Sequence, residues 1–424
     1  MPRWRRNMAS TPSSRDPAGA GNRRSNGFRQ NEFALAEVYT PMSEQELSNV
    51  LAAASAEHKS VTPWGGGTHQ GLGNVPSRID WLIGMQKLEQ TLAYEPADMT
   101  LSVQAGKTLS AVQDLLAEHG QALPIEVSQP DSSTIGGILA SALYGPKRLG
   151  AGTLRDYLIG ITVAYPGGAI AKAGGMVVKN VSGFDLMRMH HGALGTLGVI
   201  VSANFKVLPR PRSERTVRWT QSDETMLARS VELLMTSRVR PGALEIEVID
   251  GGFRGYARLE GRDRIVELLA EEAGSLLSTG FDILDQKESQ RFWRDFAASF
   301  ETDFDAQTVW IRVRLKPSET IPSLLDLLRV ERVIPVRMSF SPGLGYVDLR
   351  LSAEALESAA AFSGFLNELR DMVPRAIAMA APAFLKQDVD VWGDSVESLD
   401  LMTTLKREFD PENILNPGRY VGRL

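Results

Sequence analysis

The 424-residue chain contains no cysteine. This absence excludes disulfide bonds, thiolate ligands for an iron–sulfur cluster and a cysteine nucleophile within the chain. Histidine is also scarce, with five residues in all, and the last two are His190 and His191. The residues that follow, 192–424, therefore cannot build a histidine metal site or supply a histidine acid–base group.

The sequence also lacks long apolar runs and an excess of positive charge. No window approaches the roughly 18 uninterrupted apolar residues of a membrane-spanning helix. The formal net charge of −5 argues against a dedicated nucleic-acid-binding protein, which usually carries a basic domain. Hydrophobic residues make up 43% and charged residues 23%, which is ordinary for a globular protein. We expect neither a membrane span nor a nucleic-acid partner.

A chain of this length is expected to form two or three domains. Residues 1–29 are rich in arginine, serine, glycine and proline, and we predict a disordered basic tail, because the prolines interrupt the amphipathic helix of a transit peptide. Residues 30–212 are dense in glycine and are expected to form the first domain. Residues 213–390 are expected to form a second domain, and residues 391–424 a C-terminal segment that returns to the first.

The second domain shows the order strand, helix, strand, strand, helix twice. The first unit runs from VRWT at 217–220 to a helix ending near 278, and the second from TVWIRVRLK at 308–316 to a helix ending near 372. The second unit includes a helix expected at 322–330. This repeated order predicts an α+β domain built on an antiparallel sheet.

A glycine-rich loop stands out in the first domain. Residues 43–58 predict a helix with Ser43 as N-cap and Glu46 completing a capping box, and VTPW at 61–64 predicts a buried strand. The stretch GGGTHQGLG follows that strand directly. It fails the dinucleotide pattern G-x-G-x-x-G because position 70 is glutamine. A mobile linker and a cradle of backbone amides for a phosphate group both fit this loop by itself.

Three further clusters follow in order: SSTIGG at 132–137, GTLRDYLIG at 152–160 and KNVSGFDLMRMHHGALGTLGVI at 179–200. Together with GGGT at 65–68 and LKREFDPENILNPGR at 405–419, this ordered set resembles the vanillyl-alcohol oxidase family of PCMH-type FAD-binding oxidoreductases. Within that family the pattern is most similar to the FAD-binding, E-type subunit of bacterial glycolate oxidase. The D-type sister protein typically shows glutamate in a G-S-E-G-T-L-G run, where this chain has Leu194.

The resemblance implies a fold and a set of cofactor contacts. The fold would be α+β, with a two-subdomain PCMH-type FAD-binding domain followed by an α+β cap domain with an antiparallel sheet. The first glycine loop would wrap the FAD pyrophosphate, the second cluster would line the pyrophosphate and ribityl chain, the third would support that wall, and the start of the last strand would contact the adenine side. The implied cofactor-binding residues are Gly65, Gly66, Gly67, Thr68, His69, Gly71, Ser132, Thr134, Gly136, Gly137, Gly152, Asp156, Val199 and Ile200.

The histidines are expected to be structural. His58 and His119 lie at predicted helix ends, and His190 and His191 follow the last cluster. The histidine that tethers FAD covalently in some flavoproteins aligns with Thr68 rather than with His69. The resemblance therefore implies FAD held without a covalent bond.

The cap offers no recognisable catalytic residue and no metal site. Catalytic relatives generally carry an H-x-G-D-G-N-x-H segment there, which this chain lacks. The acidic stretches at 303–305 and 388–390 are expected to be solvated. The alternating arginines of the cap strands (Arg312, Arg314, Arg337 and Arg350) are expected to share one sheet face, which we interpret as a solvated face or partner interface ahead of a carboxylate site.

Three functions remain open. The resemblance implies the FAD-binding subunit of a complex that oxidises glycolate to glyoxylate, with a sister flavoprotein and an iron–sulfur protein as partners. Such a protein would be cytoplasmic, with any contact to the inner membrane made through its partners. The alternatives are a self-sufficient FAD-dependent oxidoreductase with an unknown substrate and a structural subunit of a flavoprotein complex.

Overall fold

The computed structural model describes most of the chain, namely residues 36–176, 186–277, 279–299, 307–319, 335–356, 358–373, 375–387, 389–393 and 396–424. Several expectations lie outside the described residues. They are the basic tail at 1–29, the KNVSGFD part of the last cluster at 179–185, the acidic stretch at 303–305, the helix at 322–330 and the first residue of the acidic stretch at 388–390.

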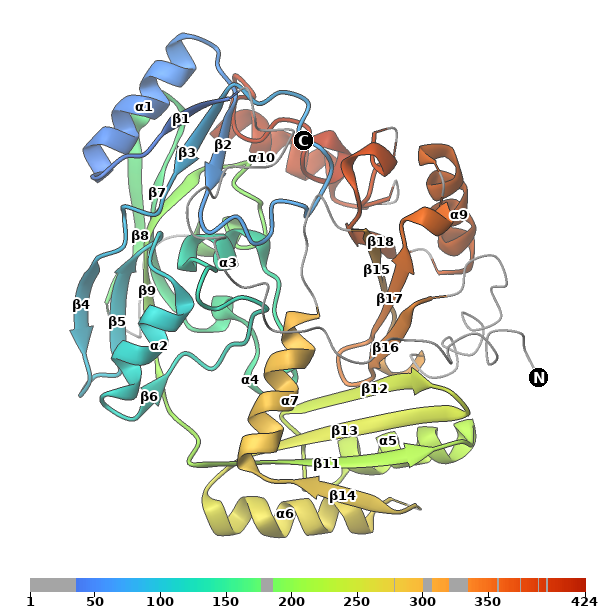
Figure 1. Cartoon of the computed structure of the whole chain (residues 1–424). Helices are drawn as coiled ribbons and strands as arrows, with labels where there is room; N and C mark the ends of the chain where they lie inside the picture. The colour runs from blue at the N-terminus through green and yellow to red at the C-terminus, as the bar shows by residue number, and fades with distance from the viewer. Residues whose placement is uncertain are drawn as a thin grey trace, which may run out of the picture.

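The N-terminal part begins with a parallel sheet of three strands in the order β1-β3-β2. These are β1 (Glu37–Tyr39), β2 (Val61–Trp64) and β3 (Trp81–Gly84), and helix α1 (Glu44–Ala56) packs against them (Figure 1). The predicted N-cap is confirmed, because the Ser43 hydroxyl accepts from the Glu46 N–H at 3.2 Å. The Glu46 carboxylate accepts from the Met42 N–H at 2.8 Å, so the return bond of the expected capping box is made one residue earlier.

An antiparallel sheet of five strands completes this part, in the order β4-β5-β9-β7-β8. Helices α2 (Leu109–Ala117) and α3 (Ile135–Ser141) contribute apolar residues to its core, and β6 (Gln121–Ala122) pairs with β10 (Leu208–Pro209). The two sheets share a second core with α1, so they form one body. The five strands are β4 (Thr91–Glu95), β5 (Thr100–Gln104), β7 (Leu158–Ala164), β8 (Ile170–Gly174) and β9 (Val199–Lys206).

The second half forms an antiparallel sheet of eight strands. Its spatial order is β14 (Phe281–Leu284), β11 (Ser213–Gln221), β13 (Gly252–Gly261), β12 (Ala243–Ile249), β16 (Arg337–Ser341), β17 (Tyr346–Ser352), β15 (Thr308–Arg314) and β18 (Ala376–Ala380). The predicted α+β fold class is confirmed. The first unit lies in the order β11-β13-β12 and the second in the mirrored order β16-β17-β15, so the two units meet where β12 pairs with β16.

Helices cover the two faces of the large sheet unequally. α5 (Glu224–Thr236), α6 (Asp263–Ser275) and α9 (Ala359–Met372) pack on one face around an apolar core. α7 (Gln286–Ala298) packs on the other face and lies between the sheet and the N-terminal part (Figure 1). No pattern in the sequence predicted α7, β14 or β18. Among the described residues no helix is long and apolar enough to cross a membrane.

The last helix, α10 (Leu399–Phe409), returns to the N-terminal part, and the helix expected to end near Phe409 is confirmed (Figure 1). The chain after it forms a parallel bridge between Leu415 and Val61 at the edge of β2. The remaining short elements are α4 (Arg148–Ala151) and 3₁₀ turns at Leu154–Asp156, Pro166–Gly168, Leu186–Met189, Pro317–Glu319, Glu354–Leu356, Ala383–Leu385 and Val421–Arg423.

A buried ion pair fastens α10 in place. Lys406 Nζ donates to the Asp410 carboxylate at 2.6 Å and to the carbonyl oxygens of Thr196 and Leu415 at 2.9 and 2.8 Å. Asp410 in turn accepts from the Leu415 N–H at 2.8 Å. All donors and acceptors of this pair are thus used inside the protein, which is the condition under which a buried ion pair is tolerated.

Replacing Lys406 by methionine should destabilise the protein strongly. The change leaves the Asp410 carboxylate buried without its cation, which typically costs about 3–5 kcal/mol. Urea unfolding followed by tryptophan fluorescence should show a lower midpoint for this variant. Arg407→Met is the matched control on the same helix, since Arg407 is exposed, and should change the stability by no more than about 0.5 kcal/mol. Equal midpoints for the two variants would contradict the structural role of the pair.

Candidate cofactor site

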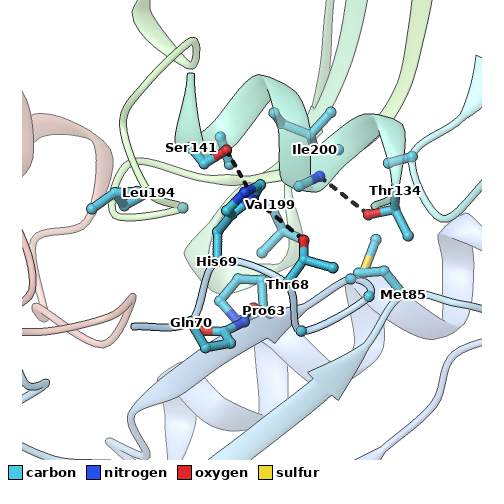
Figure 2. A pocket seen from close by; sticks show the side chains of 18 of the residues that line it. Pro63, Thr68, His69, Gln70, Met85, Thr134, Ser141, Leu194, Val199 and Ile200 are labelled. Atoms are coloured by element: carbon cyan, nitrogen blue, oxygen red, sulfur yellow. Dashed lines mark hydrogen bonds between the residues drawn. The ribbon is translucent and has the colours of Figure 1, made fainter. Parts of the chain in front are cut away.

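A narrow cavity of about 90 Å³ lies where three loops of the N-terminal part meet (Figure 2). The first loop follows β2, the second leads into α3, and the third leads into β9. Predicted site residues that line the cavity are Gly65, Gly66, Gly67, Thr68, His69, Thr134, Gly136, Gly137, Val199 and Ile200. Clusters far apart in the sequence are thus brought together around one space.

Close contact between the first two loops requires glycine. A Cβ atom on Gly65 would overlap the hydroxyl of Thr134, and one on Gly66 would overlap the carbonyl oxygen of Ser132. Gly67 has a φ of +75°, in the left-handed region that favours glycine. A larger residue at these positions would push the loops apart.

The first N–H groups of this loop are not used by the protein. Within the described part of the chain, the amides of Gly65, Gly66 and Gly67 have no hydrogen-bond acceptor. All three residues line the cavity. Consecutive free amides beside a cavity provide donors for an anion.

Arg419 engages the carbonyl groups further along the same loop. It donates to the carbonyl oxygens of His69, Gln70 and Leu72 at 3.2, 2.7 and 3.2 Å, and to Oε1 of Gln70 at 2.7 Å. Its side chain lines the cavity, and the residue is only 4% exposed. Loss of solvation lowers the pKa of its guanidinium to about 10, so it remains charged at neutral pH.

Lys386 engages the remaining carbonyl groups. Its buried Nζ donates to the carbonyl oxygens of Gly71 and Gly73 at 2.9 and 3.0 Å. Together the two cations take all five consecutive carbonyl oxygens of residues 69–73, a stretch we call the carbonyl clamp. The carbonyl oxygens of this half of the loop are therefore all bound by buried cations.

The second loop uses its amides differently. The N–H groups at the start of α3 already have acceptors: Ile135 donates to the Lys107 carbonyl at 2.9 Å, Gly136 to that of Ala105 at 2.8 Å, and Gly137 to the Thr134 hydroxyl at 3.2 Å. A Cβ atom on Gly136 would lie 2.8 Å from the Cβ of Ala105. The small residues here serve the close packing of α3 against the end of β5.

The imidazole of His69 lines the cavity in its neutral form. Its Nδ1 lies 3.3 Å from the hydroxyl of Thr68 and 3.5 Å from that of Ser141 (Figure 2). Burial and the nearby charge of Arg419 lower its pKa to about 4. A group with this pKa is a weak general base at neutral pH.

His190 and His191 have the structural surroundings expected for them. The Nε2 atom of His190 lies 3.0 Å from the Tyr165 hydroxyl, and that of His191 lies 2.8 Å from the Tyr144 hydroxyl. Burial lowers the pKa of both imidazoles to about 4. They pack against tyrosine rings and are not among the residues that line the cavity.

Some predicted site residues lie behind the cavity wall. The carbonyl oxygen of Gly71 accepts from Lys386. The carbonyl oxygen of Ser132 occupies the space that a Cβ atom on Gly66 would need. Gly152 and Asp156 support the chain near α4, where the Asp156 carboxylate accepts from the Thr153 N–H at 2.7 Å. None of these four residues lines the cavity.

Several lining residues were not predicted. Three of them are polar or charged, namely Gln70, Ser141 and Arg419. Another is Leu194, at the position where the D-type sister protein typically has glutamate. Arg419 ends the motif L-x-x-x-F-D-P-x-x-I-L-N-P-G-R, so its motif was recognised without its role. The distance of about 350 positions along the chain between Arg419 and His69 leaves no local signal for their contact.

The cap closes one side of this region with apolar residues. Leu72, Leu143 and Leu194 of the N-terminal part pack with Trp310, Met379 and Ala380 of the cap. His69 and Trp310 also line a smaller neighbouring cavity of about 20 Å³. The interface beside the cofactor cavity is therefore aliphatic and aromatic.

The cap arginines share one face, as predicted, but that face is only partly solvated. The guanidinium of Arg312 is buried and forms a bidentate pair with Asp348 at 2.8 and 2.9 Å. Arg337 pairs with Glu247, and Arg350 donates to the carbonyl of Ser299. The interpretation as a solvated face is therefore wrong for Arg312, whereas Arg337 and Arg350 are partly exposed and Arg314 is exposed.

Arg148 and Arg314 differ from these arginines. Both lie against the ring of Tyr346, at 5.6 and 5.9 Å from its centre, and within the described residues neither has a carboxylate partner. Arg148 belongs to the N-terminal part and Arg314 to the cap. A pair of unneutralised guanidinium groups therefore lies at the junction of the two parts.

Comparison with known proteins agrees with this arrangement. Residues 35–183 match the model of the FAD binding domain family. The chain is 25% identical to glycolate oxidase subunit GlcD of Bacillus subtilis, over 91% of this chain and 89% of the relative. It is 26% identical to glycolate oxidase subunit GlcE of Escherichia coli, over 78% of this chain and 84% of the relative.

A solved structure of alkyldihydroxyacetonephosphate synthase shares the fold. It superposes with a TM-score of 0.63 over 90% of this chain and 75% of the synthase, at 16% identity. The likeness covers both the glycine-loop domain and the large antiparallel sheet. The family model, the relatives and the shared fold lead to one conclusion: this chain belongs to the PCMH-type family of FAD-binding oxidoreductases.

Proposed function

We propose that this chain binds FAD without a covalent bond and takes part in the oxidation of a small 2-hydroxy acid. The observation that carries the proposal is the run of free N–H groups at Gly65, Gly66 and Gly67 beside the cavity. These amides fit an anionic diphosphate, and the absence of side chains lets it approach the backbone. The match of residues 35–183 to the FAD binding domain supports FAD as the group concerned.

The other lining residues would hold the rest of the cofactor. Thr134, Gly136 and Gly137 would form the wall opposite the first loop, and the backbone of Val199 and Ile200 would flank the adenine side. Thr68 stands at the position where a tethering histidine is expected, and Nδ1 of the neighbouring His69 is in contact with two hydroxyl groups. These features support non-covalent binding.

The substrate class follows from the relatives and from charge. GlcD and GlcE are named as subunits of glycolate oxidase, and we extend this substrate class to the present chain. Bound FAD supplies the capacity to accept a hydride equivalent. Arg148 and Arg314 would attract the carboxylate of the acid, because guanidinium groups match carboxylates in shape and charge.

The cavity lacks a base suited to neutral pH. His69 and Arg419 are the titratable side chains among its described lining residues, and the pKa of His69 is about 4. Removing the hydroxyl proton of the substrate would therefore depend on a partner. We infer that the chain works as a subunit beside a sister flavoprotein, and that an iron–sulfur partner receives the electrons, because this chain has no cysteine to bind a cluster.

A self-sufficient oxidoreductase is the second candidate. Its support is the alignment with GlcD over 91% of this chain, which includes the cap. The substrate of such an enzyme would have to be oxidised without a histidine from the cap.

The role of Gly66 in cofactor binding can be tested by adding a single methyl group. Gly66→Ala should weaken FAD binding by about 30-fold or more, because the new Cβ displaces the loop from Ser132 and misplaces charge-assisted donors. Gly364→Ala is the matched control, since a Cβ at that exposed position of α9 meets nothing within 4 Å. Quenching of flavin fluorescence measures both. Unchanged affinity of Gly66→Ala would refute the role of the loop.

The two candidate functions differ in whether the isolated chain can oxidise the substrate. The isolated chain, loaded with FAD and kept free of oxygen, should not lose flavin absorbance when excess glycolate or D-lactate is added. The complex purified from the native source should bleach under the same conditions. Rapid bleaching of the isolated chain would overturn the subunit role and favour the self-sufficient enzyme.

A further inference from the structure

Arg419, one of the two cations bound to the carbonyl clamp, has no counter-charge among the described residues. The guanidinium of Arg419 makes four hydrogen bonds, and every acceptor is a neutral oxygen of residues 69–72. Among the described residues no carboxylate forms an ion pair with it. A buried charge without a counter-charge is unfavourable, and proteins usually pair such groups.

The position of this charge points to what neutralises it. Arg419 lines the same cavity as the free amides of Gly65, Gly66 and Gly67. The loop that it holds is the continuation of these amides, and Gln70 receives two of its bonds, at 2.7 Å each. A ligand placed among the free amides would therefore lie in the positive potential of Arg419, in a region of low dielectric constant where charges act strongly.

We propose that Arg419 is a positioning residue whose missing counter-charge is the diphosphate of the bound dinucleotide. The inference rests on the proposed function and adds to it a source of affinity from the far end of the chain. Arg419 fixes the carbonyl oxygens of residues 69, 70 and 72 by hydrogen bonds, and its charge makes the cavity selective for an anion. An uncharged flavin gains from the first effect but not from the second.

Arg419 is proposed both to fix the loop and to supply positive charge. A residue that only fixed the loop would change the affinities for FAD and riboflavin together. Loss of the charge should weaken the binding of FAD and ADP, which carry a diphosphate, much more than that of riboflavin, which carries none. Loss of the loop geometry alone should weaken all three. The ratio of the dissociation constants for riboflavin and FAD is therefore the informative quantity.

The experiment uses the full-length chain freed of bound flavin. Dissociation constants for FAD and riboflavin are measured by fluorescence quenching, and that for ADP by competition with FAD. Arg419→Gln should weaken FAD and ADP binding by about 30-fold and riboflavin binding by less than about 3-fold, the scale expected for loss of hydrogen bonds and charge at an ionic ligand. Arg419→Lys keeps the charge and should retain a riboflavin-to-FAD ratio close to that of the wild type.

A surface variant serves as the control, and a conservative variant decides if Arg419→Gln does not fold. Arg407 is an exposed arginine of α10, so Arg407→Gln removes the same charge from the surface and should leave all three dissociation constants unchanged. If Arg419→Gln fails to fold, as judged by circular dichroism, Arg419→Lys decides, and a ratio shifted by about 10-fold or more in that variant would overturn the proposal. Equal weakening of FAD and riboflavin in Arg419→Gln would also overturn it. Failure of the wild type to bind FAD would instead refute the proposed function itself.

Discussion

Two buried cations, Arg419 and Lys386, hold the five carbonyl oxygens of residues 69–73, and the cofactor site depends on this clamp. The N–H and C=O groups of a trans peptide point in opposite directions, so fixing the oxygens restricts where the neighbouring amides can face. Burying a cation is unfavourable, and the loop carbonyls lessen the cost by accepting its hydrogen bonds without supplying a counter-charge. The same bonds fix the position of the loop.

The clamp also explains why the C-terminal segment must return to the N-terminal part. Arg419 and Lys386 lie more than 300 positions after the loop that they hold. Lys406 repeats the device by binding the carbonyl of Thr196, beside the third loop of the cavity. Contacts of this separation join distant parts of the chain, so the geometry of the cofactor site depends on the correct folding of the residues between them.

The large sheet contributes a wall to the site and little recognisable chemistry. Trp310, Met379 and Ala380, which pack beside the site, are apolar, and the buried arginines Arg258 and Arg312 are already paired with carboxylates. Arg148 and Arg314, which have no carboxylate partner among the described residues, lie at the junction of the two parts. A cap built in this way is suited to attracting an anion and to shielding a cofactor. These features support a division of labour with a partner that provides the base.

Local chemistry made part of this structure predictable. Features that depend on neighbours within a few residues were predicted. They include the helix N-cap at Ser43, the strand at 61–64 and the repeated order of strands and helices. The ordered glycine clusters predicted a flavin-type domain through their resemblance to a known family, and the structure shows why glycine stands at Gly65 and Gly66, where a Cβ atom would overlap Thr134 and Ser132. Helix α7 went unpredicted although its capping box of Asp285 and Glu288 is local and its buried residues Trp293, Phe296 and Ala297 follow helical spacing. Only the tertiary structure decided that the amides of the second loop are already occupied, that Arg312 is paired with Asp348, and that Arg419 holds the first loop, because each of these depends on which distant group a buried donor meets.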